Sequence, residues 1–430
     1  MQPGTLIAGR FEIQRIAGEG GMGTVFRALD RDTGEPVAIK VIHGTLESEK
    51  ERFASEARVL AELRHPAIVR YVSHGSTESG APFLAIEWLE GEDLAQTLAR
   101  GPISMRDVLA LGERIADALA LVHRRDVVHR DIKPDNIVVP GGRVSDARLV
   151  DFGIARDHSL ARRGTRTGVV IGTPGYMSPE QARGDSKVDA RADVFAFGCV
   201  LFECLTGQPP FSGEHAIALI LKIVLEDAPE VCSLRPDVPA ELNALVADMM
   251  AKAPAQRPAN GTEVLERLRH LDLRGERARP VDAQPALAAI SGGEQRWLTV
   301  VVAGTLAWDG EGADAPTNPI AATVMQVPTS GEFASLQSAV SLAAGRGAEV
   351  LRIAGGAISV VLRGGGVATD QAARAARCAL AIGAARPGLP IGIATARGQI
   401  SGHLPVGEVV ELAAREVERI VSDIHQAGTT

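Results

Sequence analysis

Two short runs in the middle of the chain have the residue types and spacing that phosphoryl transfer needs. They are H-R-D-I-K-P-D-N at 129–136 and D-F-G at 151–153. Such a transfer requires bound phosphates, metal ligands, a positioned acceptor hydroxyl and neutralising charge. Asp131 would orient the hydroxyl and take its proton, and Lys133 would neutralise the phosphate in flight. Asn136 and Asp151 would supply the oxygen ligands that Mg²⁺ prefers. A chance occurrence of both runs in this order is the weaker interpretation.

A glycine-rich segment near the start would hold phosphates. Its pattern is Gly18-x-Gly20-x-x-Gly23-x-Val25, between two predicted strands. Glycines let the backbone approach phosphates and offer N–H groups. The alternative is an ordinary glycine-rich hairpin turn. A strand and not a helix follows the glycines, which disfavours a dinucleotide-binding fold.

A lysine and a glutamate could complete the phosphate site. Lys40 closes the apolar run Val37-Ala38-Ile39-Lys40, and Glu56 lies on the next predicted helix. We expect Lys40 to meet the α- and β-phosphates and Glu56 to pair with it. The alternatives are an exposed lysine at a strand end and a solvated glutamate on a helix.

The elements around these residues predict a two-lobed α+β domain. Strands are predicted at 11–16, 24–30, 36–42 and 81–90, with a helix at 47–64 that has Phe53, Ala57, Leu60 and Leu63 on one face. After Gly91 the chain becomes mainly helical, with predicted helices at 94–99, 105–124, 189–205, 216–225 and 240–252. A small β-rich lobe followed by a larger helical lobe fits an α+β plan.

A second, smaller unit is predicted after a linker. We place the first domain at 1–273, its small lobe at about 10–90 and its large lobe at about 91–273, then a linker rich in Pro, Ala, Gly and charge at 274–293 and a second domain at 294–430. The second domain reads strand, helix, two strands in a hairpin, helix, strand and final helix. The β-α-β-β-α-β order is typical of a ferredoxin-like fold.

Composition excludes several classes of protein. The 430 residues are 45% apolar and 23% charged, and the formal net charge of −8 argues against a nucleic-acid partner. The first residues do not form a signal peptide, and no apolar run reaches membrane-spanning length. Four cysteines without metal-ligand spacing fit a reducing compartment, so we expect a cytoplasmic protein.

With six motifs in order, residues 10–273 resemble the bacterial eukaryotic-like (Hanks-type) serine/threonine protein kinases. The resemblance implies the kinase fold, with ATP and Mg²⁺ (or Mn²⁺ in its place) between the lobes and proteins as substrates. Ile86 would be the gatekeeper, and Glu87 and Leu89 would meet adenine through backbone groups. The implied ATP-binding set is Ile16, Gly18, Glu19, Gly20, Gly21, Met22, Gly23, Val25, Ala38, Lys40, Glu87 and Leu89.

The resemblance also implies structural roles. Ser178-Pro179-Glu180 matches the family's A-P-E with serine in place of alanine, and Arg257 would pair with Glu180. Asp193 would brace the catalytic loop. Ala17 stands where the family usually has a larger aliphatic residue. Lys133 and Thr173 match the serine/threonine branch and not the tyrosine kinases.

Two threonines form the expected switch. Thr165 and Thr167 lie in a basic, glycine-flanked stretch, and threonines at these positions are autophosphorylated in similar bacterial kinases. Arg130 would grip the phosphate, because phosphorylation adds nearly two negative charges and strong hydrogen-bond acceptors. The alternative is a pair of ordinary loop threonines.

Residues 294–424 resemble a class III nucleotide cyclase domain. The positions that match the two metal aspartates are Gly304 and Gly356, and Glu411 stands at the transition-state asparagine, whereas Arg415 matches the family's arginine. Glycine offers no side-chain ligand, so we expect a degenerate domain that regulates or scaffolds. An unrelated α+β domain is the alternative.

Three functions stay open at this point: an active serine/threonine kinase, a pseudokinase scaffold that only binds ATP, and a cyclic-nucleotide synthase. The complete set of catalytic residues favours the first. The resemblance also allows a homodimer, and allows the chain to be a truncated form of a longer signalling protein.

Overall fold

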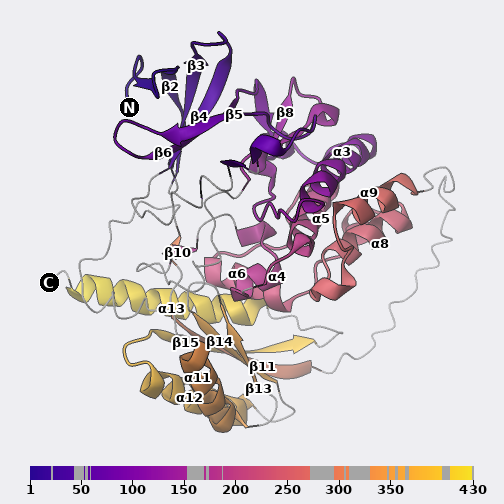
Figure 1. Cartoon of the computed structure of the whole chain (residues 1–430). Helices are drawn as coiled ribbons and strands as arrows, with labels where there is room; N and C mark the ends of the chain where they lie inside the picture. Colours follow the sequence, from indigo (N-terminus) through magenta and orange to yellow (C-terminus); the bar gives the residue numbers. More distant parts are fainter. Residues whose placement is uncertain are drawn as a thin grey trace.

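The computed structural model (Figure 1) describes residues 1–20, 23–42, 53, 57–58, 60–152, 169–170, 174–185, 187–271, 295–304, 307–308, 330–345, 348–353, 357–363, 368–399 and 407–428. Three parts follow one another along the chain: a β-rich small lobe, a helical large lobe and a C-terminal sheet with helices on both faces. No helix within these ranges has the length and apolar character needed to cross a membrane.

The small lobe is a six-stranded antiparallel sheet in the order β1-β2-β3-β4-β6-β5. One face of it is a separate apolar core that includes Phe26, Ile39 and Phe83. The predicted strands are therefore present, and β1 and β5 are additional. The strands are β1 (Leu6–Ile7), β2 (Phe11–Gly20), β3 (Gly23–Asp30), β4 (Pro36–Ile42), β5 (Tyr71–Ser76) and β6 (Pro82–Glu87).

The helix predicted at 47–64 is described only in part. Its four apolar positions, Phe53, Ala57, Leu60 and Leu63, are all buried in the core of the large lobe, as its pattern predicted. Leu84 of β6 belongs to the same core, so this segment joins the two lobes.

The large lobe is built around α5 (Ala190–Thr206). Nearly every residue of α5 from Ala192 to Leu205 is buried, which is typical of a central helix that is apolar all round. The other helices are α2 (Leu94–Leu98), α3 (Met105–His123), α4 (Pro179–Arg183), α6 (Ala216–Leu225), α7 (Val231–Leu234), α8 (Ala240–Met249) and α9 (Gly261–Arg269). The 3₁₀ turns are η1 (Pro134–Asn136), η2 (Val144–Asp146), η4 (Pro174–Tyr176) and η5 (Pro254–Gln256).

Three short strands, which we did not predict, carry the functional loops of the large lobe. They are β7 (Gly91–Asp93), β8 (Ile137–Pro140) and β9 (Arg148–Leu149), in the order β7-β8-β9. The 3₁₀ turn η1 enters β8 and Asp151 follows β9, so pairing of β8 with β9 brings the two motif loops together.

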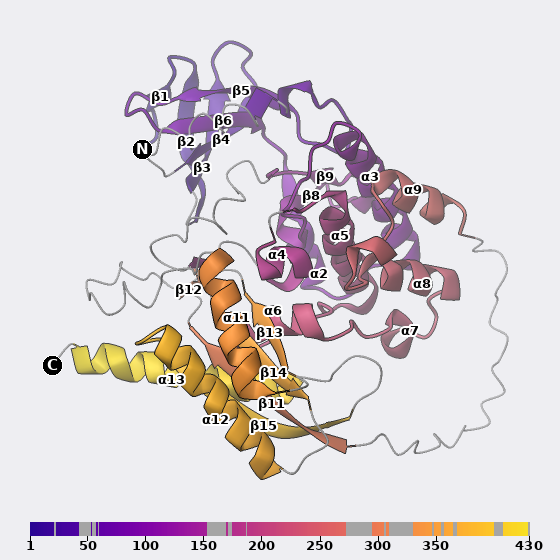
Figure 2. The same ribbon diagram turned by 60° about the horizontal axis from the view of Figure 1, so that its bottom comes forward.

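The C-terminal part is a four-stranded sheet in the order β13-β14-β11-β15, and all neighbours are antiparallel. The helices α11 and α12 cover one face, and α13 covers the other and lies against α6 of the large lobe (Figure 1, Figure 2). The elements are β11 (Gln295–Ala303), α11 (Ser330–Ala344), β13 (Ala348–Arg352), β14 (Ile358–Arg363), α12 (Ala368–Ala385), β15 (Ile391–Gln399) and α13 (Gly407–Gly428). Two further short strands, β10 (Val169–Val170) and β12 (Ala307–Trp308), pair in parallel.

Candidate active site

The backbone of the catalytic loop is held by one buried carboxylate. Asp193, in the first turn of α5, is fully buried and accepts the N–H of His129 and the N–H of Arg130, each at 2.7 Å. The Nε2 of His123 donates to the same carboxylate at 2.9 Å, because its Nδ1 accepts the Gly261 N–H at 3.0 Å. Burial alone would raise the pKa of Asp193, but the bond from His123 and the neighbouring positive charge and N–H groups hold it below its ordinary value. Arg130 has a left-handed φ of 66°, which these bonds stabilise.

His129 connects this loop to the second motif. Its Nε2 donates to the Val150 carbonyl at 3.2 Å, its Nδ1 accepts the Asp131 N–H at 3.3 Å, and its ring lies 4.6 Å from that of Phe152. Burial lowers the pKa of His129, so the neutral ring that satisfies both bonds is the stable form. His129 thus fixes the position of the Asp131 backbone.

The side chains that could position a hydroxyl and a metal ion lie side by side. The Nδ2 of Asn136 donates to the carbonyl of Asp131 at 2.7 Å and to its Oδ2 at 2.9 Å. The Asn136 carbonyl accepts the Val150 N–H at 3.0 Å, directly before Asp151. Asp151 has a left-handed φ of 58°. This set of carboxylate and amide oxygens fits a hard cation such as Mg²⁺.

Lys40 reaches the same place from the small lobe. The Nζ of Lys40 lies 2.5 Å from Oδ1 of Asp151. The predicted partner of Lys40, Glu56, lies outside the described residues. Strand pairing determines the face of the sheet on which the Lys40 side chain lies, because directly opposed residues share a face. Val25 is opposite Lys40, and Ala38 is opposite Ile86. The face away from the small-lobe core therefore carries these predicted nucleotide contacts together.

The hinge between the lobes is fixed at Glu87. Its N–H donates to the Arg70 carbonyl at 2.9 Å, and its Oε1 accepts from Arg70 N at 2.7 Å and from Arg148 Nη1 at 2.6 Å. Because the N–H and the side chain are engaged inside the protein, the carbonyl is the group that Glu87 can offer to a ligand. Leu89 follows two residues later, beyond the end of β6.

The glycine-rich segment forms the β2–β3 hairpin. Residues Ile16, Gly18, Glu19 and Gly20 lie on β2, and Gly23 begins β3. A Cβ at Gly23 would lie 2.2 Å from the Val41 carbonyl oxygen, so packing on β4 alone requires glycine there. Gly21, Met22, Thr165, Thr167 and Thr173 lie outside the described residues.

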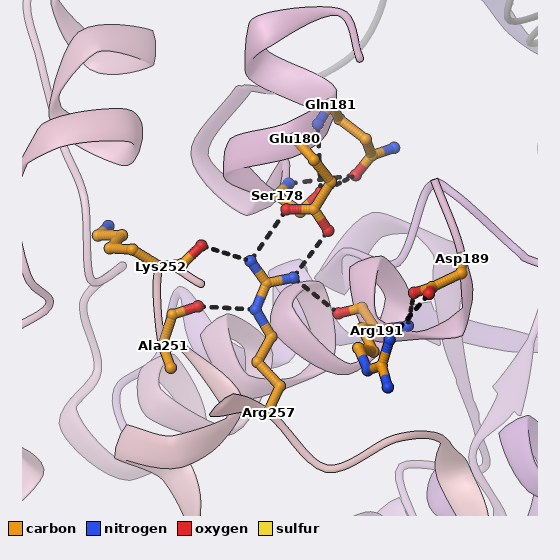
Figure 3. A network of polar contacts seen from close by, with 8 residues as sticks. All are labelled: Ser178, Glu180, Gln181, Asp189, Arg191, Ala251, Lys252 and Arg257. Atoms are coloured by element: carbon orange, nitrogen blue, oxygen red, sulfur yellow. Dashed lines mark hydrogen bonds and ion pairs between the residues drawn. The ribbon is translucent and has the colours of Figure 1, made fainter. Parts of the chain in front are cut away.

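A buried ion pair joins α4 to the segment that follows η5 (Figure 3). Arg257 donates through Nη1 and Nη2 to Glu180 at 2.7 and 2.9 Å, and also donates to the carbonyls of Ala251, Arg191 and Lys252. The structure thus brings together the two residues that the sequence paired. The guanidinium thus makes all of these hydrogen bonds inside the protein, away from water, which suits a structural pair.

The departure at Ser178 has a physical reason. Its Oγ accepts the Gln181 N–H at 3.4 Å and the Gln181 side chain returns to Ser178 N at 3.1 Å, which forms a capping box at the start of α4. Alanine could not make this cap.

Sequence reasoning missed two residues that hold the catalytic loop. His123 lies at the last turn of α3 and Gln181, on α4, donates through Nε2 to the Arg130 carbonyl at 3.0 Å. The cap pattern Ser-x-x-Gln could have revealed α4. No local signal reveals the contact of His123 with Asp193, which lies 70 residues further along the chain.

Comparison with known proteins agrees with this geometry. A model of the protein kinase domain matches residues 11–269. The chain is 36% identical over 299 residues to the serine/threonine-protein kinase pkn3 of Myxococcus xanthus, which covers 67% of this chain and 54% of the relative. It is 36% identical over 323 residues to the DNA damage-responsive serine/threonine-protein kinase RqkA of Deinococcus radiodurans, covering 72% of this chain and 48% of the relative.

A solved structure shares the fold. The crystal structure of Rad53 1-466 in complex with AMP-PNP has a TM-score of 0.51 and 25% identity, and the match covers 60% of this chain and 64% of that chain. This chain therefore belongs to the protein kinase family, and the domain is of the bacterial Hanks-type serine/threonine class, as the resemblance predicted. The chain spans about half the length of the curated relatives it matches.

Proposed function

We propose that this chain is an active kinase that transfers the ATP γ-phosphate to serine or threonine hydroxyls of proteins. The observation that carries the proposal is the placement of Asp131, Asn136 and Asp151 on two loops that His129 and Asp193 lock together. Asp131 would accept the proton of the substrate hydroxyl. Lys133, two residues later on the same loop, would neutralise the transferred phosphate.

Members of this family use ATP and Mg²⁺. In this chain Asn136 and Asp151 would hold the metal ion, which supplies charge neutralisation when bound, and Lys40 would hold the phosphates. The apolar face with Val25 and Ala38 would cover adenine, and Glu87 and Leu89 would bind it through the backbone. The analogue AMP-PNP in the similar Rad53 structure supports this assignment.

The test compares three forms of the full chain with labelled ATP and Mg²⁺: wild type, Asp131→Asn and Lys40→Met. We expect transfer to a threonine peptide by the wild type and a loss of about 10³-fold or more in both variants, since each removes a group used in the transition state. Equal labelling by all three would mean that the activity belongs to a contaminant and would leave a nucleotide-binding scaffold as the function.

We also propose that autophosphorylation of Thr165 or Thr167 activates the kinase. Arg130 supports this, because its backbone is fixed beside Asp131 and a phosphothreonine would be held by its charge. The check is the Thr165→Ala/Thr167→Ala chain, with a Thr206→Ala chain as control, because the Thr206 hydroxyl bonds to the Phe202 and Gln208 carbonyls at the end of α5. Autophosphorylation and peptide transfer at the wild-type rate in the double variant would remove the switch.

For residues 294–430 we propose a ferredoxin-like, cyclase-related domain without cyclase activity. Support comes from the element order and from the strand order β13-β14-β11-β15. Gly304 has a φ of 100° and no side chain with which to bind a metal, and Glu411 is engaged with Lys222 of the large lobe. Gly356 lies outside the described residues. Production of cyclic AMP or cyclic GMP by the purified chain would contradict this.

A cytoplasmic location and protein substrates complete the proposal. All four cysteines are free, which suits a reducing compartment. A homodimer stays a prediction that light scattering of the purified chain can check.

A further inference from the structure

Helix α13 contacts the rest of the molecule through two faces. Val410, Ala413, Ala414 and Val417 are buried and belong to an apolar core shared with the sheet. The contact is close, since a Cβ at Gly392 of β15 would lie 2.2 Å from the Ala413 carbonyl oxygen. A second stripe, Glu411, Arg415 and Glu418, follows the i, i+4, i+7 spacing of one helix face.

The charged stripe of α13 meets the large lobe at the start of α6 and along it. Oε1 of Glu411 lies 2.8 Å from Nζ of Lys222, and the two side chains are only 16% and 15% exposed. Arg415 pairs with Glu214 at 3.1 Å. The third pair joins His215 to Glu418 at 2.7 Å.

The two pairs of oppositely charged side chains in this contact, Glu411 with Lys222 and Glu214 with Arg415, are complementary. Among the described residues, Glu214, His215 and Glu411 have the closeness of a metal-binding group. Lys222 and Arg415 already neutralise its two carboxylates, so a domain contact explains the cluster without a metal ion. We name these five residues with Glu418 the α6–α13 contact.

A second contact between the same two parts involves the segment that contains the predicted switch. Strand β10 pairs in parallel with β12 of the C-terminal part, Val169 with Ala307 and Val170 with Trp308. Strand β10 lies between Asp151 and Ser178, two residues after Thr167. The backbone edge of β10 that pairs with β12 is thus occupied from within the chain.

The α6–α13 contact is linked to the catalytic loop through α4. Helix α6 packs against η4 and α4, the elements that follow β10. From α4, Gln181 donates to the Arg130 carbonyl. The C-terminal part is therefore connected to the catalytic loop indirectly, through α6 and then α4.

We infer that residues 295–428 act as a docked inhibitor in cis, held by the α6–α13 contact, and that they reduce the phosphorylation of protein substrates. An extended peptide can bind a protein by pairing with an exposed strand edge, and β12 occupies that edge of β10. Release of the C-terminal part opens the edge of β10 and frees α6. This inference rests on the proposed kinase activity.

The experiment uses the full chain and one charge reversal, Glu411→Lys, which places two cations together at Lys222. The matched control is Glu416→Lys on the same helix, because Glu416 pairs only with Arg419 of α13 among the contacts described. The rescue is the double swap Glu411→Lys/Lys222→Glu. Each chain is measured twice: by kcat/KM for a threonine peptide, and by amide hydrogen exchange of α6 and α13, which does not depend on activity.

We expect Glu411→Lys to speed exchange in α6 and α13 and to raise kcat/KM by about 5-fold or more, within the usual range of coupling between sites. Glu416→Lys should match the wild type, and the double swap should restore both readings. Faster exchange without a rise in kcat/KM overturns the inhibitory role, and unchanged exchange overturns the docking itself. If the wild-type chain shows no activity that the Asp131→Asn substitution removes, the proposed kinase function itself is refuted.

Discussion

This chain has two networks of ion pairs, and they differ in burial. Around Asp193 and Glu180 every charge lies inside the large lobe: the Asp193 and Arg257 side chains are fully buried, and His123 and Glu180 are 3% and 6% exposed. In the α6–α13 contact, Lys222 and Glu411 are 15% and 16% exposed, and Arg415 and Glu214 are 58% and 71% exposed.

The burial of an ion pair decides how much free energy is needed to break it. A buried charge that loses its partner cannot recover solvation, so the inner network fixes one geometry of the catalytic loop. Charges at a partly exposed contact can exchange a protein partner for water at small cost. The inner network therefore suits a permanent scaffold, and the outer one suits a contact that opens and closes.

The largest expected effect comes from Asp193→Asn. The amide cannot accept the His129 and Arg130 N–H groups and the His123 proton as a carboxylate does, so the catalytic loop loses its position. We expect kcat/KM to fall by about 10²-fold or more, since small displacements of catalytic groups have effects of that size. Stability should fall by about 3–5 kcal/mol, measured by urea unfolding.

The control is Asp189→Asn at the N-cap of the same helix. Its side chain accepts the Arg191 N–H from an exposed position, and asparagine caps as well as aspartate. Asp193→Asn chains with wild-type kcat/KM would show that the loop does not depend on the inner network.

The next effect is on stability. Glu180→Gln leaves Arg257 buried and unpaired, and we expect a loss of about 3 kcal/mol in the free energy of unfolding. The comparison variant is Asp248→Asn, because Asp248 pairs with Arg267 at 2.8 Å on the surface and should contribute only about 0–1 kcal/mol. Equal losses for both variants would remove the distinction by burial.

How far the sequence predicts this arrangement depends on distance along the chain. The catalytic side chains are predictable because the chemistry fixes residue types within one loop: Asn136 lies five residues from Asp131 and bonds to it. The long helices are predictable from apolar spacing. The short strands β7 to β9 escaped prediction because two to four residues carry too little pattern. Helix α9 was also missed, although Asn260 is its N-cap.

Contacts between distant segments were beyond sequence reasoning. His123 meets Asp193 and Lys222 meets Glu411 across 70 and 189 residues, and no local pattern encodes such pairs. Glu411 shows the consequence. The sequence placed it at a degenerate catalytic position, whereas the structure places it in the α6–α13 contact.

A smaller effect concerns pH and the inner network. Because burial lowers the pKa of His129 below its ordinary value of 6.5, the folded chain binds fewer protons than the unfolded chain once pH falls below 6.5. The contribution of His129 to the free energy of unfolding should be constant above pH 6.5. Below pH 6.5 it should fall by up to about 1.4 kcal/mol per pH unit. Urea unfolding between pH 7.5 and 5.5 measures the slope, which should be shallower in His129→Phe. An identical slope in that variant would assign the acid sensitivity to other groups.

The smallest effect separates the two networks most directly. Glu411→Gln removes one charge of the α6–α13 contact but leaves Lys222 bonded to the Ser212 carbonyl at 2.8 Å. We expect the free energy of unfolding of the large lobe to change by only about 1 kcal/mol, in contrast to Glu180→Gln, because Lys222 keeps its bond to Ser212 and the amide oxygen at 411 can still accept from it. Urea unfolding of the two variants under the same conditions makes the comparison. If Glu411→Gln cost as much as Glu180→Gln, the outer contact would be as permanent as the inner one, and a domain fixed so firmly could not act as a releasable inhibitor.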